Sequence, residues 1–424
     1  MTTRTQSLPN AQNVTREVLP NGITVLVYEN FTAQSVVLTG SVSVGSIFDP
    51  VGQDGLAALT ADALMRGSQS YDFDTINESL ESIGADLGIS GSTFTTSVSG
   101  KALGEDLSVL LRILSDVLRH PTFPADEIER LRGEIVTGLN YREQDTRYRA
   151  GRAFYSALYP ETHPYYASSD GTPETVGRLS IEDVRAFHAQ HYGPREMILV
   201  IVGAITAEQA IALVRENFAD WENPSQPVRQ RPTDFALPKQ TSRVNIAIPG
   251  KTQSDIVMGT LGPARLSPDF QAAQLVNSVL GQFGMMGRIG GKIREELGLA
   301  YYASSSVEGG ITALPWRVAA GVDPANVDLA IDRIIVELRQ IISEPVTADE
   351  LSDNLSYFIG RMPLQLETNE GVASTIRNIE TFGLGLDYLL TYPDMIRSLT
   401  PHDLLRAAQH YLNPDALVIA VAGR

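Results

Sequence analysis

A repeated pattern at the end of each half of the chain constrains the fold more strongly than any other feature. SIEDVRAFHAQHYGPREMILVIVGAI occupies residues 180–205, and TPHDLLRAAQHYLNPDALVIAVAGR occupies residues 400–424. Each stretch reads as a capped amphipathic helix, a Gln-His-Tyr triplet, a proline, an apolar β run and a glycine. Because these features agree in order and in length, they indicate an internal duplication.

A proline-rich segment separates the two copies. Residues 221–240, WENPSQPVRQRPTDFALPKQ, contain four prolines in twenty positions. Proline fixes φ and removes a backbone donor, so the segment is predicted to be an extended, semi-rigid linker. The sequence therefore predicts an N-terminal domain over residues 1–220, a linker over 221–240 and a C-terminal domain over 241–424.

Each half alternates β-branched runs with helical patterns. GITVLVYEN and SVVLTGSVSVGSIFD predict neighbouring strands in the first half, and VNIAIPG and DIVMGTLGP predict strands in the second. A helix is expected from Asp54 to Arg66, with Asp54 as its N-cap and Gly67 at its end. The predicted fold class is α+β, with a largely antiparallel sheet backed by helices in each half.

Composition excludes several kinds of chemistry. The 424 residues include no cysteine, so disulfides, thiolate nucleophiles and cysteine-liganded metals are excluded. The formal net charge of −17 makes nucleic acid an unfavourable partner. The polar N-terminal stretch has no apolar core, and no run approaches 18 apolar residues. We therefore expect a cytoplasmic protein with no membrane partner.

Common catalytic motifs are absent. The stretch GQFGMMGRIGGKI resembles a phosphate-binding loop, but Met286 and Ile293 occupy positions that the loop reserves for glycine and for serine or threonine. No G-x-S-x-G elbow occurs. His188 and His191 are three residues apart on a predicted helix and could share a metal, but no third ligand pattern lies near them. The alternative interpretation is a pair of helix-surface histidines.

Three further segments carry a family resemblance: LPNGITVLVYEN at residues 19–30, GSVSVGSIFDPVGQDGLAALTADALMRGS at 40–68, and GRIGGKIREELGLAYYASSS at 287–306. With the duplication, they make the chain similar to the pitrilysin-type zinc metallopeptidases, in the branch of the mitochondrial processing peptidases. The resemblance covers nearly the whole chain. It implies two similar α+β units that form one crescent, half of a peptidase chamber.

The zinc motif of that family is lost here. Active relatives carry H-x-x-E-H on the helix after Gly-Leu-Ala, where two histidines bind zinc and the glutamate acts as general base. In this chain the first ligand position is Ala58, the base position is Ala61, and the second ligand position is Asp62. A methyl group can neither bind zinc nor accept a proton, and one carboxylate makes a poor site. We therefore predict no metal in this chain.

The third zinc ligand of the family is a glutamate on a later helix. An ungapped count places this position at Gly138 and the supporting glutamate position at Leu131. A shift of four residues would bring Glu134 to the ligand position. Even then Glu134 would have no partner ligands.

The second half retains a different part of the family's machinery. Active members use an arginine and a tyrosine seven residues apart, and I-R-E-E-L-G-L-A-Y supplies Arg294 and Tyr301 at that spacing. A guanidinium and a phenol can donate hydrogen bonds to a peptide carbonyl and to the oxyanion formed in hydrolysis. If the register shifts by one, Tyr302 takes this position. Without the family context, Arg294 would be a surface residue and Tyr301 a strand residue packed on the core.

The glycine-rich stretch 281–291 precedes this motif. In the family such a loop faces the internal cavity, so the resemblance makes Gly284 and Gly287 candidate substrate-binding positions. The alternative is an ordinary connection between helices.

The resemblance implies a specific function. It suggests the non-zinc subunit of a heterodimeric zinc-dependent peptidase, whose homologous partner carries the zinc and whose substrates are extended peptides or unfolded segments. Such peptides would bind by adding a strand to a sheet edge. Two alternatives stay open: a scaffold homologue without peptidase activity, and a homodimer that binds peptides without cleaving them.

Overall fold

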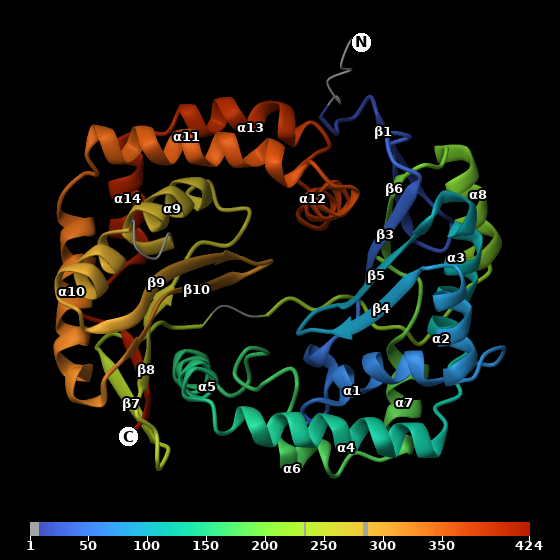
Figure 1. Cartoon of the computed structure of the whole chain (residues 1–424), viewed down its shortest axis with the longest axis horizontal. Coiled ribbons are helices and arrows are strands. Elements are labelled where there is room, and N and C mark those ends of the chain that lie inside the picture. The colour runs from blue at the N-terminus through green and yellow to red at the C-terminus, as the bar shows by residue number, and fades with distance from the viewer. Residues whose placement is uncertain (1–7, 233–234, 283–286) are drawn as a thin grey trace. The chain divides into compact units, whose positions relative to one another are not determined.

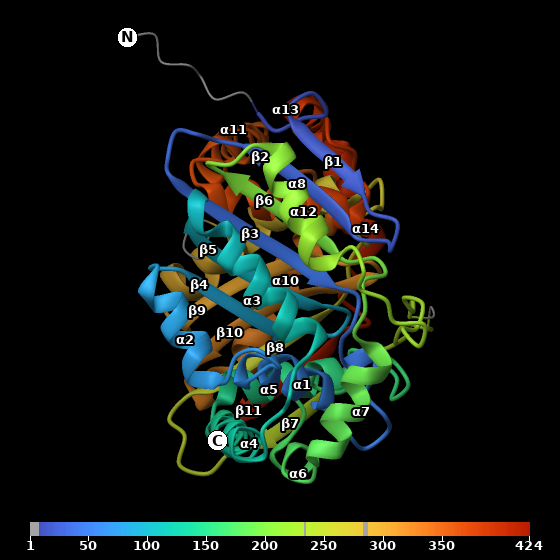
Figure 2. The ribbon, with the colours of Figure 1, turned by 90° about the vertical axis from the view of Figure 1, so that its right-hand side faces the viewer.

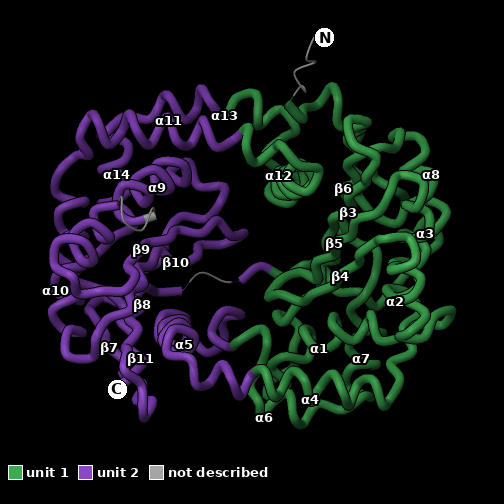
Figure 3. Tube along the Cα trace, viewed as in Figure 1, with its two compact units in different colours: residues 1–138, 168–230, 363–392 green, residues 139–167, 231–362, 393–424 purple. Residues whose placement is uncertain are grey.

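The computed structural model describes residues 8–232, 235–282 and 287–424. The chain divides into two compact units, coloured separately in Figure 3. Unit 1 comprises Met1–Gly138, Ser168–Gln230 and Pro363–Tyr392, and unit 2 comprises Leu139–Ala167, Arg231–Met362 and Pro393–Arg424. Each unit contains one sheet with helices on both faces, as the predicted fold class requires (Figure 1).

Unit 1 is built on a six-stranded sheet with the order β1-β2-β6-β3-β5-β4. Helices α3 (Leu107–Arg119) and α8 (Ala207–Phe218) cover one face (Figure 2), and α12 (Asn369–Phe382) covers the other. The strands are β1 (Val14–Val18), β2 (Thr24–Glu29), β3 (Ser35–Val42), β4 (Asp86–Gly91), β5 (Thr96–Leu103) and β6 (Ile198–Gly203).

Unit 2 is built on a five-stranded sheet with the order β7-β11-β8-β10-β9. One face carries α9 (Phe270–Asn277), α10 (Val327–Ser343) and α14 (Pro401–Tyr411), and the other face carries α5 (Thr146–Leu158) (Figure 1). The strands are β7 (Ser242–Ala247), β8 (Ser254–Leu261), β9 (Ala300–Gly309), β10 (Ala313–Val322) and β11 (Val418–Gly423).

The two sheets confirm the predicted duplication. Five strands of unit 1, β2-β6-β3-β5-β4, correspond in order to β7-β11-β8-β10-β9 of unit 2. In each sheet the strand of the repeated motif, β6 or β11, is parallel to one neighbour and antiparallel to the other. The helices that precede them, α7 (Ile181–His191) and α14, both begin with a capping box, Ser180 with Asp183 and Thr400 with Asp403.

The compact units do not coincide with the linear halves 1–220 and 241–424, because two helices are exchanged. Helix α12 belongs to the second half of the chain, yet it buries Val372, Ala373 and Ile376 against the sheet of unit 1. Helix α5 belongs to the first half and packs Ala150 and Phe154 on the sheet of unit 2. The burial of these apolar faces determines which sheet each helix joins.

The remaining helices complete the units. They are α1 (Leu56–Ala63), α2 (Phe73–Ser82), α4 (Ala125–Arg142), α6 (Pro173–Val176), α11 (Ala348–Gln365) and α13 (Tyr388–Arg397). Among the residues described, no helix is both long enough and apolar enough to span a membrane.

Candidate functional site

Helix α1 carries the three positions where the related peptidases hold two zinc ligands and the base. Ala58 and Asp62 are four residues apart, lie on one face of the helix and are partly exposed, whereas Ala61 is fully buried. The N-cap residue of the helix is Gly55, whose φ of 94° suits glycine. The predicted cap by Asp54 is wrong, because the carboxylate of Asp49 accepts the N–H groups of Gly55 at 2.9 Å and Ala57 at 2.8 Å.

Asp62 is a partly buried carboxyl group on α1. Burial and the neighbouring Asp170 raise its pKa, Arg66 one helical turn away lowers it, and the net result is a pKa of about 6. The guanidinium of Arg66 also pairs with Glu134 at 3.0 Å and approaches Glu127 at 3.7 Å. Glu134, the alternative third-ligand position, is therefore held by an arginine.

The residue at the third-ligand position, Gly138, has no side chain that could bind a metal. Gly138 lies on α4 and is exposed, and a Cβ placed there would meet no atom within 4 Å. Leu131, at the position of the supporting glutamate, is buried with 5% of its surface exposed. Within the described ranges, no group of three or more histidine or acidic side chains is arranged to hold a metal ion. The residues present do not fit the zinc that the resemblance implies for this helix in active relatives.

The edge strand β4 lies directly beside this position. Gly91 ends the strand, and a Cβ there would come within 2.9 Å of the Cα of Ala58. β4 is the last strand of its sheet and pairs only with β5 on its inner side. The corresponding edge strand of unit 2 is β9, and side chains of the chain itself bind its carbonyl groups. Gln274 donates to the carbonyl of Val307 at 2.9 Å, and Asn277 donates to that of Ser305 at 3.4 Å.

Arg294 and Tyr301 lie on consecutive elements of unit 2. Arg294 belongs to the π-helical segment Gly290–Glu296, and its side chain is 42% exposed with Glu295 at 3.7 Å. π-Helical turns are frequent at functional sites. Gly298, with a φ of 61°, reverses the chain before β9, where Tyr301 is 66% exposed. The structure records no hydrogen bond or cation–π contact between the two side chains.

Tyr302 points to the other side of β9 and is engaged in a polar cluster. Its hydroxyl donates to Asp255, which is 1% exposed and also accepts from Thr146. The guanidinium of Arg147 lies 4.6 Å from the centroid of the tyrosine ring. Burial and the bond to Asp255 raise the pKa of Tyr302. This cluster links the exchanged helix α5 to the sheet. The hydroxyl of Tyr302 therefore has a structural role in unit 2.

The glycine-rich stretch is described in part. Gly284 lies outside the described residues. Gly287 is buried, and a Cβ there would come within 2.5 Å of the Cα of Gly281, so glycine is required for this close approach. The next residue, Arg288, makes a bidentate ion pair with Glu350 of α11 at 2.8 and 2.7 Å.

Sequence reasoning missed three charged groups that shape these regions: Asp49, Asp255 and Arg288. A lone aspartate at the start of an apolar strand, SDIVMG, is a signal that could have singled out Asp255. The contacts of Asp49 and Arg288 have no such local signal, because they form only in the folded chain.

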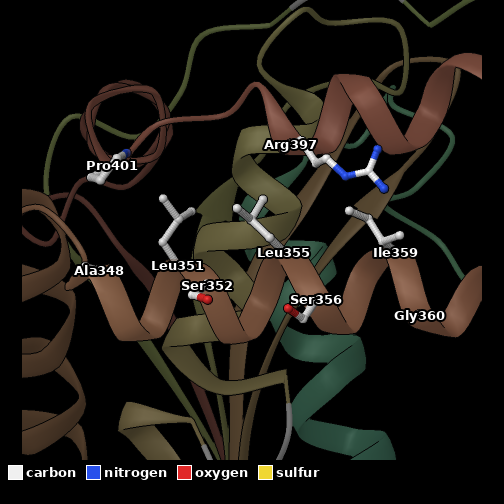
Figure 4. Close-up of a pocket in the computed structure, with 9 residues that line it drawn as sticks. All are labelled: Ala348, Leu351, Ser352, Leu355, Ser356, Ile359, Gly360, Arg397 and Pro401. Atoms are coloured by element: carbon white, nitrogen blue, oxygen red, sulfur yellow. The ribbon is translucent and has the colours of Figure 1, made fainter.

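A separate groove of about 610 Å³ runs along α11 in unit 2 (Figure 4). Leu351, Leu355 and Ile359 point from α11 in one direction, toward the side on which Arg397 lies. None of the sequence-predicted site residues lines this groove.

Comparisons with known proteins place the chain in one family. Residues 24–164 match the model described as insulinase (peptidase family M16), and residues 178–356 match the model described as the peptidase M16 inactive domain. An uncharacterized zinc protease of Mycobacterium leprae is 25% identical over 302 residues, and the match covers 70% of this chain but only 66% of that protein. The non-peptidase homolog YmxG of Helicobacter pylori is 23% identical, with 84% of this chain and 81% of that protein covered.

Solved structures agree with this placement. The crystal structure of a peptidase M16 inactive domain from Pseudomonas fluorescens superimposes with a TM-score of 0.90 and 25% identity, and covers 97% of this chain and 98% of that one. Family models matched across both halves, together with a shared fold over nearly the full length, show that this chain belongs to the insulinase family of peptidases, family M16.

Proposed function

We propose that this protein is the non-zinc subunit of a heterodimeric zinc-dependent peptidase. The observation that carries the proposal is the contrast between its two halves. The zinc positions on α1 hold Ala58, Ala61 and Asp62, while Arg294 and Tyr301 keep their spacing and project exposed donor groups. A partner with an intact H-x-x-E-H motif would hold zinc and supply the activated water.

In this proposal Arg294 and Tyr301 act on a peptide bound at the partner's metal. The phenol of Tyr301 donates to the scissile carbonyl, and its donor strength matters most when negative charge develops on that oxygen. The guanidinium of Arg294 donates to a neighbouring peptide carbonyl and orients the chain. Both side chains are exposed, so neither has to leave a buried partner to reach a substrate.

The open edge of β4 supports a site for an extended peptide in unit 1. Peptide groups on an unpaired edge can hydrogen-bond to any sequence, which suits substrates of varied composition. A strand added there would pass close to Ala58, where the backbone of Gly91 already lies against α1. The chain would thus bind peptide at this edge without cleaving it.

Reconstitution tests the proposal. The isolated chain should bind no stoichiometric zinc and cleave nothing, whereas adding a zinc-motif M16 subunit encoded in the same genome should produce peptidase activity. Arg294→Ala and Tyr301→Phe should each lower kcat of the reconstituted enzyme by about 100-fold, the scale of one lost oxyanion donor. Matched controls are Arg333→Ala and Tyr141→Phe, which alter exposed side chains outside the motif.

A second candidate is a scaffold or peptide-binding homologue without peptidase activity. The H. pylori relative, which is described as a non-peptidase homolog, favours it. Size-exclusion chromatography of the complex, combined with peptidase assays of the wild type and both motif variants, distinguishes the candidates. A stable complex with the zinc subunit whose activity is unchanged by both motif variants would support the scaffold and exclude the assigned catalytic roles.

A further inference from the structure

Unit 2 contains an open cavity of about 290 Å³ that plays no part in the proposed peptidase function. Five separate segments meet at it: the loop after α5, the linker before β7, the end of β8, the β9–β10 turn and the end of α14. Its lining residues are His163, Pro232, Phe235, Leu237, Leu261, Gly262, Thr312, Ala313, His410 and Tyr411. Among these described residues there is no carboxylate, lysine or arginine.

One wall of the cavity is aromatic, and its rings pack against one another. His163 is 7% exposed, and its ring stacks on Tyr159 at a centroid distance of 4.4 Å and meets the edge of Phe235 at 5.2 Å. The Nδ1 atom of His163 accepts the N–H of Tyr165 at 3.2 Å, which assigns the proton of the neutral ring to Nε2. Burial lowers the pKa of His163, which favours that neutral form.

One hydroxyl at the cavity has no partner. The Oγ1 atom of Thr312 is buried and makes no hydrogen bond. A buried polar atom without a partner costs about 1–3 kcal/mol, so such atoms are few in folded proteins and often mark a site where something else binds. Thr312 Oγ1 can both donate and accept.

The duplication shows that the fold does not require this opening. In the first copy, the histidine and tyrosine of the Gln-His-Tyr triplet are buried. Tyr192 is 2% exposed with its hydroxyl 3.0 Å from that of Thr96, and His191 is 8% exposed. In the second copy the same triplet ends at His410 and Tyr411, which line the cavity. The same helix–strand junction is therefore sealed in unit 1 and open in unit 2.

We propose that the cavity in unit 2 binds a small, neutral aromatic molecule that carries a hydroxyl or carbonyl oxygen. The volume lies at the lower end of the range for ligand sites and suits a single substituted ring. The rings of His163 and Phe235, which meet edge to face, provide apolar surface for that ring. Thr312 Oγ1 supplies the hydrogen-bonding group. Among the lining residues that the structure describes, no carboxylate, lysine or arginine is present to compensate the desolvation of an ionic ligand, which favours a neutral one.

The probe for this site is p-cresol, and toluene is the matched compound without a hydroxyl. Binding to the full chain is followed by saturation-transfer NMR and by the imidazole Cε1–H resonances, which are easily resolved because the chain has six histidines. We expect p-cresol to shift the resonances of His163 and His410. Thr312→Val should weaken p-cresol binding about fivefold, the effect of one neutral hydrogen bond, and leave toluene binding unchanged.

Two further variants complete the test. Ala313→Leu should fill the cavity and abolish binding of both probes, while the backbone carbonyl of Ala313 still accepts from Tyr159. Thr391→Val, which removes an exposed threonine hydroxyl on α13, should bind as the wild type does. Equal affinity of wild type and Ala313→Leu for p-cresol would overturn the proposal, and so would equal weakening of toluene and p-cresol by Thr312→Val.

A final arm identifies the source of the aromatic group. The capped peptide acetyl-Ala-Tyr-Ala-amide presents the same phenol on a polypeptide. Shifts at His163 with p-cresol alone would assign the site to a free small molecule, and shifts with both would assign it to aromatic side chains as well. Absence of shifts with either probe would refute the site, whatever the outcome of the peptidase reconstitution.

Discussion

Replacing Asp62 by asparagine tests the electrostatics of the altered zinc position. The side chain of Asp62 is partly buried on α1, and in the folded chain its pKa is raised from 3.8 to about 6 by burial and by Asp170. Asparagine has nearly the same shape and no charge. The substitution should therefore stabilise the protein at neutral pH, although it alters a position that binds metal in active relatives.

The sign and size of the effect follow from proton linkage. Because the folded-state pKa exceeds the unfolded value, the folded chain holds the proton more tightly between pH 3.8 and about 6. The stabilising contribution of Asp62 is complete below pH 3.8 and is lost as the pH rises to about 6. A pKa change of this size corresponds to roughly 3 kcal/mol, an upper bound because Asp62 retains some contact with water.

Urea unfolding of wild type and Asp62→Asn from pH 4 to 8 measures this effect. The difference in unfolding free energy should grow in favour of the variant from pH 4 to about 6 and then level off. Asp49, whose burial raises its pKa to about 7, is present in both proteins and contributes equally to both. Asp170→Asn should lower the pKa of Asp62 and so narrow the pH range over which the difference in unfolding free energy changes. A difference that does not vary with pH, or that favours wild type as the pH rises, would refute this reasoning.

Two further predictions concern the exchanged helices, and both are read from chemical unfolding curves. Ile376→Ala should lower the unfolding free energy by about 2–5 kcal/mol, because Ile376 is 1% exposed where α12 packs on the sheet of unit 1; a loss below 1 kcal/mol would contradict that packing. Tyr302→Phe should cost about 1–3 kcal/mol by removing a donor from buried Asp255, whereas Tyr301→Phe should be neutral; equal costs would argue against the assigned cluster.

Much of the fold could be predicted from local pattern. The apolar periods, the capping residues Ser180 and Thr400 and the repeated Gln-His-Tyr triplets were enough to predict two similar α+β halves. The exchange of α5 and α12 could not be predicted, because an apolar stripe shows that a helix is buried without showing which sheet it covers. The sequence pattern predicts Asp54 as the cap of α1, whereas in the structure Asp49 accepts the N–H groups of Gly55 and Ala57.

The sequence by itself determined that α1 lacks the zinc ligands of its active relatives, because ligand chemistry depends on side-chain identity, and Ala58 and Ala61 have no donor atom. It also determined the spacing of Arg294 and Tyr301. Only the tertiary structure decided which of two adjacent tyrosines is available. Tyr302 is bound to Asp255 and covered by Arg147, residues far away in the chain, while Tyr301 stays exposed. Strand alternation separates the two side chains, but only long-range contacts determine which side is buried.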